Sequence, residues 1–207
     1  AFEDQDLFRD DRAWIYKTEQ FGYFGPKIST DRRKKLILGF NGGVGYAKAA
    51  GNYAAQFYPT QIAKDEGFQQ IIWTDSNNHN RIEEAGTMNL FFKINHTLIT
   101  SPTSDSILDG VTRKSIIDLA KSMNIIVEER DITVDELLTA QKSGSLKEIF
   151  GTGTAVTVLP INGFGYRGKR FSIISNEQKT SDLLKIKLNN IQYAKTNDFS
   201  HWQYKIT

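Results

Sequence analysis

The sequence predicts a mixed α/β or α+β fold. Short apolar runs typical of strands intermix with segments of helical period, and the two kinds do not alternate strictly. No internal repeat is visible, which argues against a solenoid or a propeller. At 207 residues the chain is long enough for one large domain or two small ones. A change in composition and pattern separates a charge-dense N-terminal segment, 1–35, from a domain that we expect to span 36–207.

The domain is predicted to begin with a strand and a helix. The apolar run at 36–40 predicts a strand, because it stops at the turn residues 41–43. Residues 54–66 follow a helical pattern that Gly67 can end. Pro59 either bends this helix or marks a late start, since proline fits only the first turn of a helix without strain.

A buried strand and a hairpin are predicted next. Residues 69–75 form an apolar run followed by a cluster of turn residues, as expected of a buried strand. The runs 88–94 and 97–101 are separated only by Asn95 and His96, the spacing of a two-residue β-hairpin. We therefore expect these two strands to pair antiparallel.

A helix over 111–123 is predicted after the turn at Asp109 and Gly110, because its apolar residues recur at helical spacing. The apolar run at 125–130 predicts a strand after it. The segments that remain are a Gly/Thr-rich strand region, a basic hairpin, a helix and an aromatic tail, at 151–161, 166–174, 181–192 and 199–207.

Between them, a helix over 134–141 carries strong terminal signals. Thr133 is a predicted N-cap, and Glu136 stands where a capping-box carboxylate reaches back to the N-cap. Gly144 supplies the residue that ends such a helix.

Composition excludes several function classes. Hydrophobic residues make up 39% and charged residues 24% of the chain, as in ordinary folded domains. The net charge of +2 is too small to predict a nucleic-acid partner. The absence of cysteine excludes disulfides, thiolate zinc sites and a cysteine nucleophile. The three histidines are far apart in the sequence, so no metal site is expected: His79, His96 and His201.

No apolar stretch approaches the eighteen residues that a membrane-spanning helix needs. The N-terminus also lacks the basic start and apolar block of a secretory signal. A cytoplasmic protein with no membrane partner is the simplest expectation.

Two glycine-rich segments resemble nucleotide-binding motifs but lack the structural context that those motifs need. Gly163, Gly165 and Gly168 match a dinucleotide-binding spacing, but a strand pattern follows where a helix N-terminus should hold the pyrophosphate. We interpret this motif as a hairpin turn. The segment 42–51 lacks the Gly-Lys-Ser/Thr ending of a phosphate-binding loop.

Lys48 is a candidate nucleophile. Small residues flank it and leave room for its amine to meet a planar group, the setting of a Schiff-base lysine. The competing interpretation is a solvated surface lysine. Three loops, 84–89, 110–113 and 151–155, can offer convergent backbone N–H groups to a phosphate and a carboxylate.

These segments resemble, in the same order, those of branched-chain amino acid aminotransferases, fold-type IV enzymes that use pyridoxal phosphate. The likeness is dense from Gly42 to Pro160 and weaker at 189–202. It implies the family's large domain, with mixed sheets in a pseudo-barrel and flanking helices. It also implies a homodimer with amino acids and 2-oxo acids as its small-molecule partners.

The resemblance implies a role for each residue around the cofactor ring. Lys48 would bond covalently to pyridoxal phosphate and then move the proton from the substrate Cα. Tyr53 would bind the phenolic oxygen, and Glu84 would keep the pyridine nitrogen protonated, which lets the ring accept electrons. Thr87 would lie near Glu84 and the ring. Taken singly, Tyr53 is better explained as a packing aromatic at a helix start and Glu84 as a solvated turn carboxylate.

Two anion sites are implied as well. The backbone N–H groups of Val111 and Thr112, at a helix start, would hold the phosphate together with the Thr154 hydroxyl. The N–H groups of Thr154 and Ala155 would receive the substrate α-carboxylate. Taken singly, Thr112 is better explained as a helix cap and Thr154 as a strand-entry residue; the functional roles gain weight only when the residues are taken together.

The N-terminal part departs from the family pattern. Family members carry a further domain before the lysine loop, which supplies a phosphate-binding arginine and part of the side-chain pocket. About forty residues precede that loop here and show little likeness to that domain, so we expect 1–35 to be a divergent segment or a remnant. The arginine of that domain cannot be assigned here. A further family arginine precedes the lysine loop by a short stretch, and the basic residues there leave its position open: Arg32, Arg33, Lys34 and Lys35.

The expected function is transfer of the amino group of leucine, isoleucine or valine to 2-oxoglutarate through pyridoxal phosphate. Two alternatives stay open. Another fold-type IV activity, D-amino acid transamination or aminodeoxychorismate cleavage, would use the same cofactor. A non-catalytic fragment would keep the large-domain fold without turnover.

Overall fold

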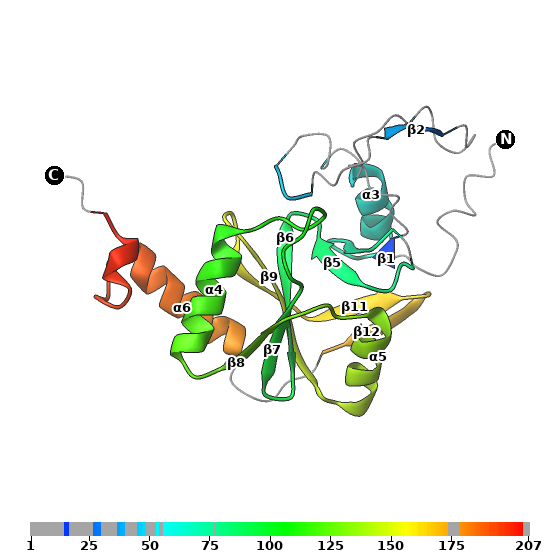
Figure 1. Ribbon diagram of the computed structural model, residues 1–207. Helices are drawn as coiled ribbons and strands as arrows, with labels where there is room; N and C mark the ends of the chain where they lie inside the picture. Colours follow the sequence, from blue (N-terminus) through cyan, green and yellow to red (C-terminus); the bar gives the residue numbers. More distant parts are fainter. Residues whose placement is uncertain are drawn as a thin grey trace.

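The computed structural model describes residues 15–16, 27–29, 37–39, 45–48, 53, 56–76, 78–173 and 179–204. Within these residues, eight strands form one mixed sheet (Figure 1). Its strands are β1 (Ile15–Tyr16), β4 (Ile72–Thr74), β5 (Ile82–Ala85), β6 (Met88–Ile94), β7 (Thr97–Thr100), β8 (Ile126–Glu129), β9 (Leu146–Gly153) and β10 (Thr157–Ile161). The pairs β1–β4 and β7–β8 are parallel and the others antiparallel, so the predicted mixed class is confirmed.

Strand β6 is the centre of this sheet. Along one edge it pairs first with β5 and then with β7, and along the other edge it pairs with β9. The turn at Asn95 and His96 joins β6 to β7 as an antiparallel hairpin, as the sequence predicts. Both faces of β6 are buried, which explains its continuous apolar run.

Two apolar clusters cover the two faces of the sheet. Along β6, Phe91 belongs to one cluster while Leu90 and Phe92 belong to the other, because alternate side chains point to opposite faces. Helices α4 (Val111–Ser122) and α6 (Thr180–Gln192) contribute to the first cluster, and α5 (Val134–Ser143) contributes to the second. Figure 1 shows α4 and α6 on one side of the sheet and α5 on the other.

The predicted helices form, with adjusted ends. Helix α3 (Phe57–Asp65) begins later than the predicted residue 54, with Pro59 in its first turn, and Gly67 follows with a φ of +83°. The Thr133 side chain caps α5 by accepting a 3.0 Å hydrogen bond from the Glu136 N–H. The Glu136 carboxylate pairs with Arg130 rather than completing a capping box, because that guanidinium offers two charged donors at 2.7 and 3.0 Å.

The glycine motif near residue 165 is a hairpin turn, as interpreted. Strands β11 (Gly163–Tyr166) and β12 (Lys169–Ser172) pair antiparallel around Arg167 and Gly168, both at positive φ. The chain then reaches α6 and a short 3-10 turn, η1 (Ser200–Trp202).

Two short strands, β2 (Lys27–Ser29) and β3 (Ile37–Gly39), pair antiparallel with each other. The basic residues at 32–35 and the predicted turn at 41–43 lie outside the described residues. In the part of the chain that the structure describes, no helix is both long and apolar enough to cross a membrane.

Candidate active site

A pocket of about 220 Å³ lies where the β5–β6 turn, the start of α4 and the β9–β10 turn meet. In Figure 1 the start of α4 and the β5–β6 turn lie at the same end of the sheet. The residues predicted to surround the cofactor all line this pocket: Lys48, Tyr53, Glu84, Thr87, Val111, Thr112 and Thr154. Ala155 follows Thr154 in the exposed β9–β10 turn and does not line the pocket.

A row of three polar side chains forms one wall. Glu84 on β5 lies opposite Asn89 on β6, and Asn89 lies opposite Thr152 on β9. Directly paired residues of neighbouring strands point to the same face of a sheet. The β5–β6 hairpin therefore places Glu84 and Asn89 together, and pairing with the distant strand β9 adds Thr152 to the same pocket.

The Glu84 carboxylate is fixed by two hydrogen bonds to one oxygen. The Leu108 N–H donates to Oε1 at 2.6 Å, and the Asn89 side-chain amide donates to it at 3.0 Å. The second proton of that amide is directed to the Leu108 carbonyl at 2.9 Å. The carboxyl group is therefore held in one place by the loop that leads into α4.

Burial raises the pKa of Glu84 to about 8. The Leu108 N–H opposes this rise by binding the charged form, and the neighbouring Glu83 carboxylate adds to it. Burial also raises the pKa of the Tyr53 hydroxyl, and the negative charge of Glu84 adds to that shift. Glu84 therefore carries a proton in the folded chain near neutral pH.

The first turn of α4 forms the second wall. Its N-cap, Gly110, has an extended conformation and no side-chain cap among the described residues, while Val111 and Thr112 line the pocket. The first N–H groups of a helix have no partner within the helix and favour an anion. A side chain at Gly110 would overlap the Asn89 carboxamide, so glycine is required for this close approach.

Lys48 lines the pocket from the turn at 45–48, and its side chain is exposed. This turn packs against the loop that precedes α4. Gly45 lies so close to the Ser106 backbone that a side chain there would overlap it, and the Tyr46 N–H donates to the Asp105 carbonyl at 3.3 Å. The amine and the partly buried Glu84 carboxyl group therefore share one pocket.

Two buried polar residues that line the pocket were not among the predicted site residues. Asn89 is 6% exposed and orients Glu84, and Thr152 is 1% exposed with a hydroxyl that has no hydrogen-bond partner among the described residues. Both lie inside the loops 84–89 and 151–155 that suggested anion binding. Their side-chain direction depends on the β6–β9 register, which no local pattern reveals.

A comparison with known families shows which family the chain belongs to. The family described as Amino-transferase class IV matches residues 44–164, more than half of the chain and every element that lines the pocket. The chain belongs to the class IV aminotransferases. In this class IV chain the match includes Lys48, Glu84 and Thr154.

Known proteins agree with this assignment. Branched-chain-amino-acid aminotransferase 2 of Bacillus subtilis (strain 168) is 41% identical over 151 residues, which are 73% of this chain and 41% of that protein. The chain thus spans about half the length, or less, of the curated relatives it matches.

Solved structures share the fold. The branched-chain aminotransferase of the archaeon Thermoproteus uzoniensis, solved with norvaline, matches with a TM-score of 0.63 at 25% identity, over 76% of this chain and 48% of that one. The branched-chain amino acid aminotransferase from Escherichia coli matches with a TM-score of 0.62 at 27% identity. That match covers 77% of this chain and 50% of that one.

Proposed function

We propose that this chain carries the cofactor site of a branched-chain amino acid aminotransferase. The reaction is transfer of the amino group of leucine, isoleucine or valine to 2-oxoglutarate with pyridoxal 5'-phosphate. The observation that carries the proposal is one pocket lined by Lys48, the partly buried Glu84 and the start of α4, which has no side-chain cap among the described residues. The names of the relatives support the substrate class.

The residues of the pocket fit this cofactor. A pyridine nitrogen needs an acidic partner, a phosphate needs N–H donors, and an aldehyde needs an amine, and each of these groups lines the same pocket. The buried Thr152 hydroxyl, which has no partner among the described residues, is a further sign of a polar occupant. When bound, the cofactor supplies an electron sink for the substrate Cα.

Two side chains of the pocket would handle protons. Lys48 removes the proton from the substrate Cα and returns it during transfer, a role that an amine at the mouth of the pocket can take. Glu84 holds a proton at the ring nitrogen. Its raised pKa lets it share that proton near neutral pH, and Asn89 and Leu108 keep its carboxyl group oriented. Tyr53 would bind the phenolic oxygen, and Thr87 would flank the ring.

The anionic groups would be held by backbone donors. The N–H groups of Val111 and Thr112 bind the phosphate at the positive end of the α4 dipole, together with the Thr154 hydroxyl. The N–H groups of Thr154 and Ala155 bind the substrate carboxylate. Ala155 does not line the pocket, so this contact lies at its rim.

The proposal extends to the setting of the protein. We expect a cytoplasmic homodimer, with residues 36–207 as the cofactor-binding domain and 1–35 as a divergent segment. Analytical ultracentrifugation of the purified chain tests the dimer: a monomer at micromolar concentration would contradict it.

A half-reaction tests the function itself. Purified chain loaded with pyridoxal phosphate is mixed with L-leucine, and the visible absorption and the 2-oxo acid product are followed. We expect the absorption to be lost as 4-methyl-2-oxopentanoate forms, and 2-oxoglutarate to restore it. Turnover with D-alanine but not L-leucine would favour a D-amino acid transaminase. Bound cofactor without any turnover would favour a non-catalytic fragment.

A further inference from the structure

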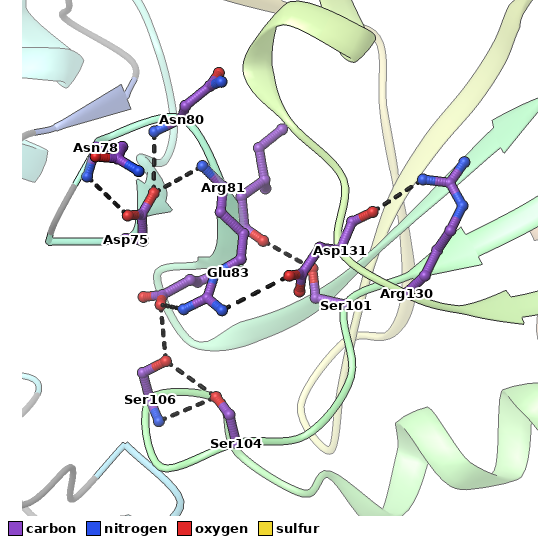
Figure 2. Close-up of polar contacts among 11 residues, drawn as sticks. Asp75, Asn78, Asn80, Arg81, Glu83, Ser101, Ser104, Ser106, Arg130 and Asp131 are labelled. Carbon is purple, nitrogen blue, oxygen red and sulfur yellow. Dashed lines mark hydrogen bonds and ion pairs between the residues drawn. The ribbon is translucent and has the colours of Figure 1, made fainter.

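Glu83 is the neighbour of Glu84 on β5, but it does not line the pocket. It is 5% exposed, and its carboxylate accepts a 2.8 Å hydrogen bond from the Ser106 hydroxyl. The Arg81 guanidinium donates to the same oxygen at 3.3 Å and also faces Asp131 at 3.7 Å. Figure 2 shows Ser106 on one side of the Glu83 carboxylate and Arg81 between Glu83 and Asp131.

Ser106 belongs to a tight turn, residues 104–107, in the loop before α4. Its N–H donates to the Ser104 hydroxyl at 3.2 Å, and the two hydroxyls lie 3.0 Å apart (Figure 2). The Ile107 N–H closes the turn on the Ser104 carbonyl at 3.2 Å, and the Ile107 side chain is buried. These hydrogen bonds make the turn compact, and the hydrogen bond from Ser106 to Glu83 attaches it to β5.

The turn at 104–107 also supports the turn at 45–48 that carries Lys48, here called the lysine loop. Its Ser106 backbone fills the space beside Gly45, and its Asp105 carbonyl accepts the Tyr46 N–H at 3.3 Å, two residues before Lys48. A displacement of Ser106 would therefore displace the backbone that carries the amine.

The turn is also joined to the pocket wall. Leu108, two residues after Ser106, donates its N–H to Glu84 at 2.6 Å. Two adjacent carboxylates on β5 thus hold one loop at two points, Glu83 at Ser106 and Glu84 at Leu108. The lysine loop packs against the part of this loop that Glu83 holds.

We infer that Glu83 is a positioning residue that sets the place of the Lys48 amine relative to Glu84, acting through Ser106. It acts at a distance from the cofactor and the substrate. A carboxylate at this depth is costly to bury unless it is paired, and its hydrogen bond from Ser106 joins the strand that carries Glu84 to the turn against which the lysine loop packs. The inference rests on the proposed function of the pocket.

Ser106→Ala tests this inference by comparing two forms of the cofactor. Pyridoxal phosphate must meet Lys48 to be bound covalently, whereas pyridoxamine phosphate has no aldehyde and binds without it. We expect Ser106→Ala to raise the Kd for pyridoxal phosphate about tenfold, the effect of one hydrogen bond, and to leave the Kd for pyridoxamine phosphate within about twofold. Tryptophan fluorescence during titration gives both constants.

Ser122→Ala is the matched control, because Ser122 also donates one 2.7 Å hydrogen bond but lies at the far end of α4. It should leave both constants unchanged. Glu83→Gln keeps an oxygen that can accept from Ser106, so its affinity for pyridoxal phosphate should stay within about threefold of the wild type. Glu83→Leu should match Ser106→Ala.

Equal weakening of both cofactor forms in Ser106→Ala would indicate a general structural role and overturn the inference. Unchanged binding of both forms would overturn it too. A failure of the proposed function looks different, because the wild-type chain itself would then bind neither form, and the inference would fall with it. Borohydride trapping gives an independent measurement. At saturating cofactor we expect Lys48 to be trapped more slowly in Ser106→Ala than in the wild type, because the amine is misplaced.

Discussion

Asn89 lies directly opposite Glu84 across the β5–β6 pair, and its side-chain amide donates a 3.0 Å hydrogen bond to the Glu84 carboxylate. The same amide binds the Leu108 carbonyl, and the Leu108 N–H returns a hydrogen bond to Glu84. This closed set of contacts holds a partly buried acid against the pocket. Burial raises the pKa of this carboxyl group to about 8, although the hydrogen bond from the Leu108 N–H opposes the rise.

Glu84 should make the stability of the cofactor-free chain depend on pH. Burial raises its pKa from 4.5 to about 8, so between these values the folded chain holds a proton that the unfolded chain has released. The contribution of Glu84 to the free energy of unfolding is therefore fully present below about pH 4.5 and is lost as the pH rises to about 8. We expect Glu84→Gln to remove this decline, which should amount to a few kcal/mol at most.

Urea denaturation of both proteins at about pH 5 and about pH 8 measures this difference. Glu128→Gln, an exposed carboxylate paired with Arg130, is the control and should follow the wild type. Parallel stability curves for the wild type and Glu84→Gln would contradict a raised pKa at Glu84.

The buried Thr152 hydroxyl should destabilise the ligand-free chain. Its hydroxyl is buried with no partner among the described residues, whereas the equally buried Thr100 hydroxyl donates to the Leu90 carbonyl at 2.7 Å. Valine has nearly the same shape as threonine. We expect Thr152→Val to raise the free energy of unfolding by up to about 1 kcal/mol, and Thr100→Val to lower it by about 1 kcal/mol. Equal losses in the two variants would show that Thr152 has a hydrogen bond after all.

Glu148 should stabilise the fold without affecting cofactor binding in the pocket. Its buried carboxylate accepts the Thr180 N–H at 2.6 Å and the Ser181 N–H at 3.0 Å, and it faces Lys93 at 3.7 Å. It thereby holds the start of α6 against β9. We expect Glu148→Ala to lower the free energy of unfolding by about 3 kcal/mol, because charged hydrogen bonds are lost and the partly buried Lys93 loses its charged partner.

The affinity of Glu148→Ala for pyridoxal phosphate should stay within about twofold, since α6 does not line the pocket. Glu128→Ala, with its exposed ion pair, should cost less than about 1 kcal/mol. A large loss of cofactor affinity in Glu148→Ala would mean that the position of α6 is coupled to the pocket.

Local chemistry in the sequence predicts the helices and the hairpin because their signals lie within a few residues. Thr133 caps α5, and Gly144 ends it at a φ of +76°. Glu136 is the exception, since Arg130, six residues earlier, takes its carboxylate and no spacing rule includes that ion pair. Helix α3 begins late for the local reason that Pro59 sits in its first turn.

The site is predictable only in part, for a physical reason. The family resemblance names the residues that would touch the cofactor, such as Lys48 and Glu84, and the fold brings them to one pocket. Asn89 and Glu83 act through partners on another strand or loop, whereas Thr152 reaches the pocket wall only through the pairing of β9 with β6. These placements follow from strand register and loop packing, which the local sequence pattern does not give.

The most direct measurement is the site of covalent attachment of the cofactor. The purified chain is mixed with pyridoxal phosphate, reduced with borohydride, digested and mapped by mass spectrometry. We expect the phosphopyridoxyl mass on Lys48, with the visible absorption and the label both absent from Lys48→Ala. Label on other lysines at the same level in both proteins, or no label in the wild type, would contradict the assignment of this pocket.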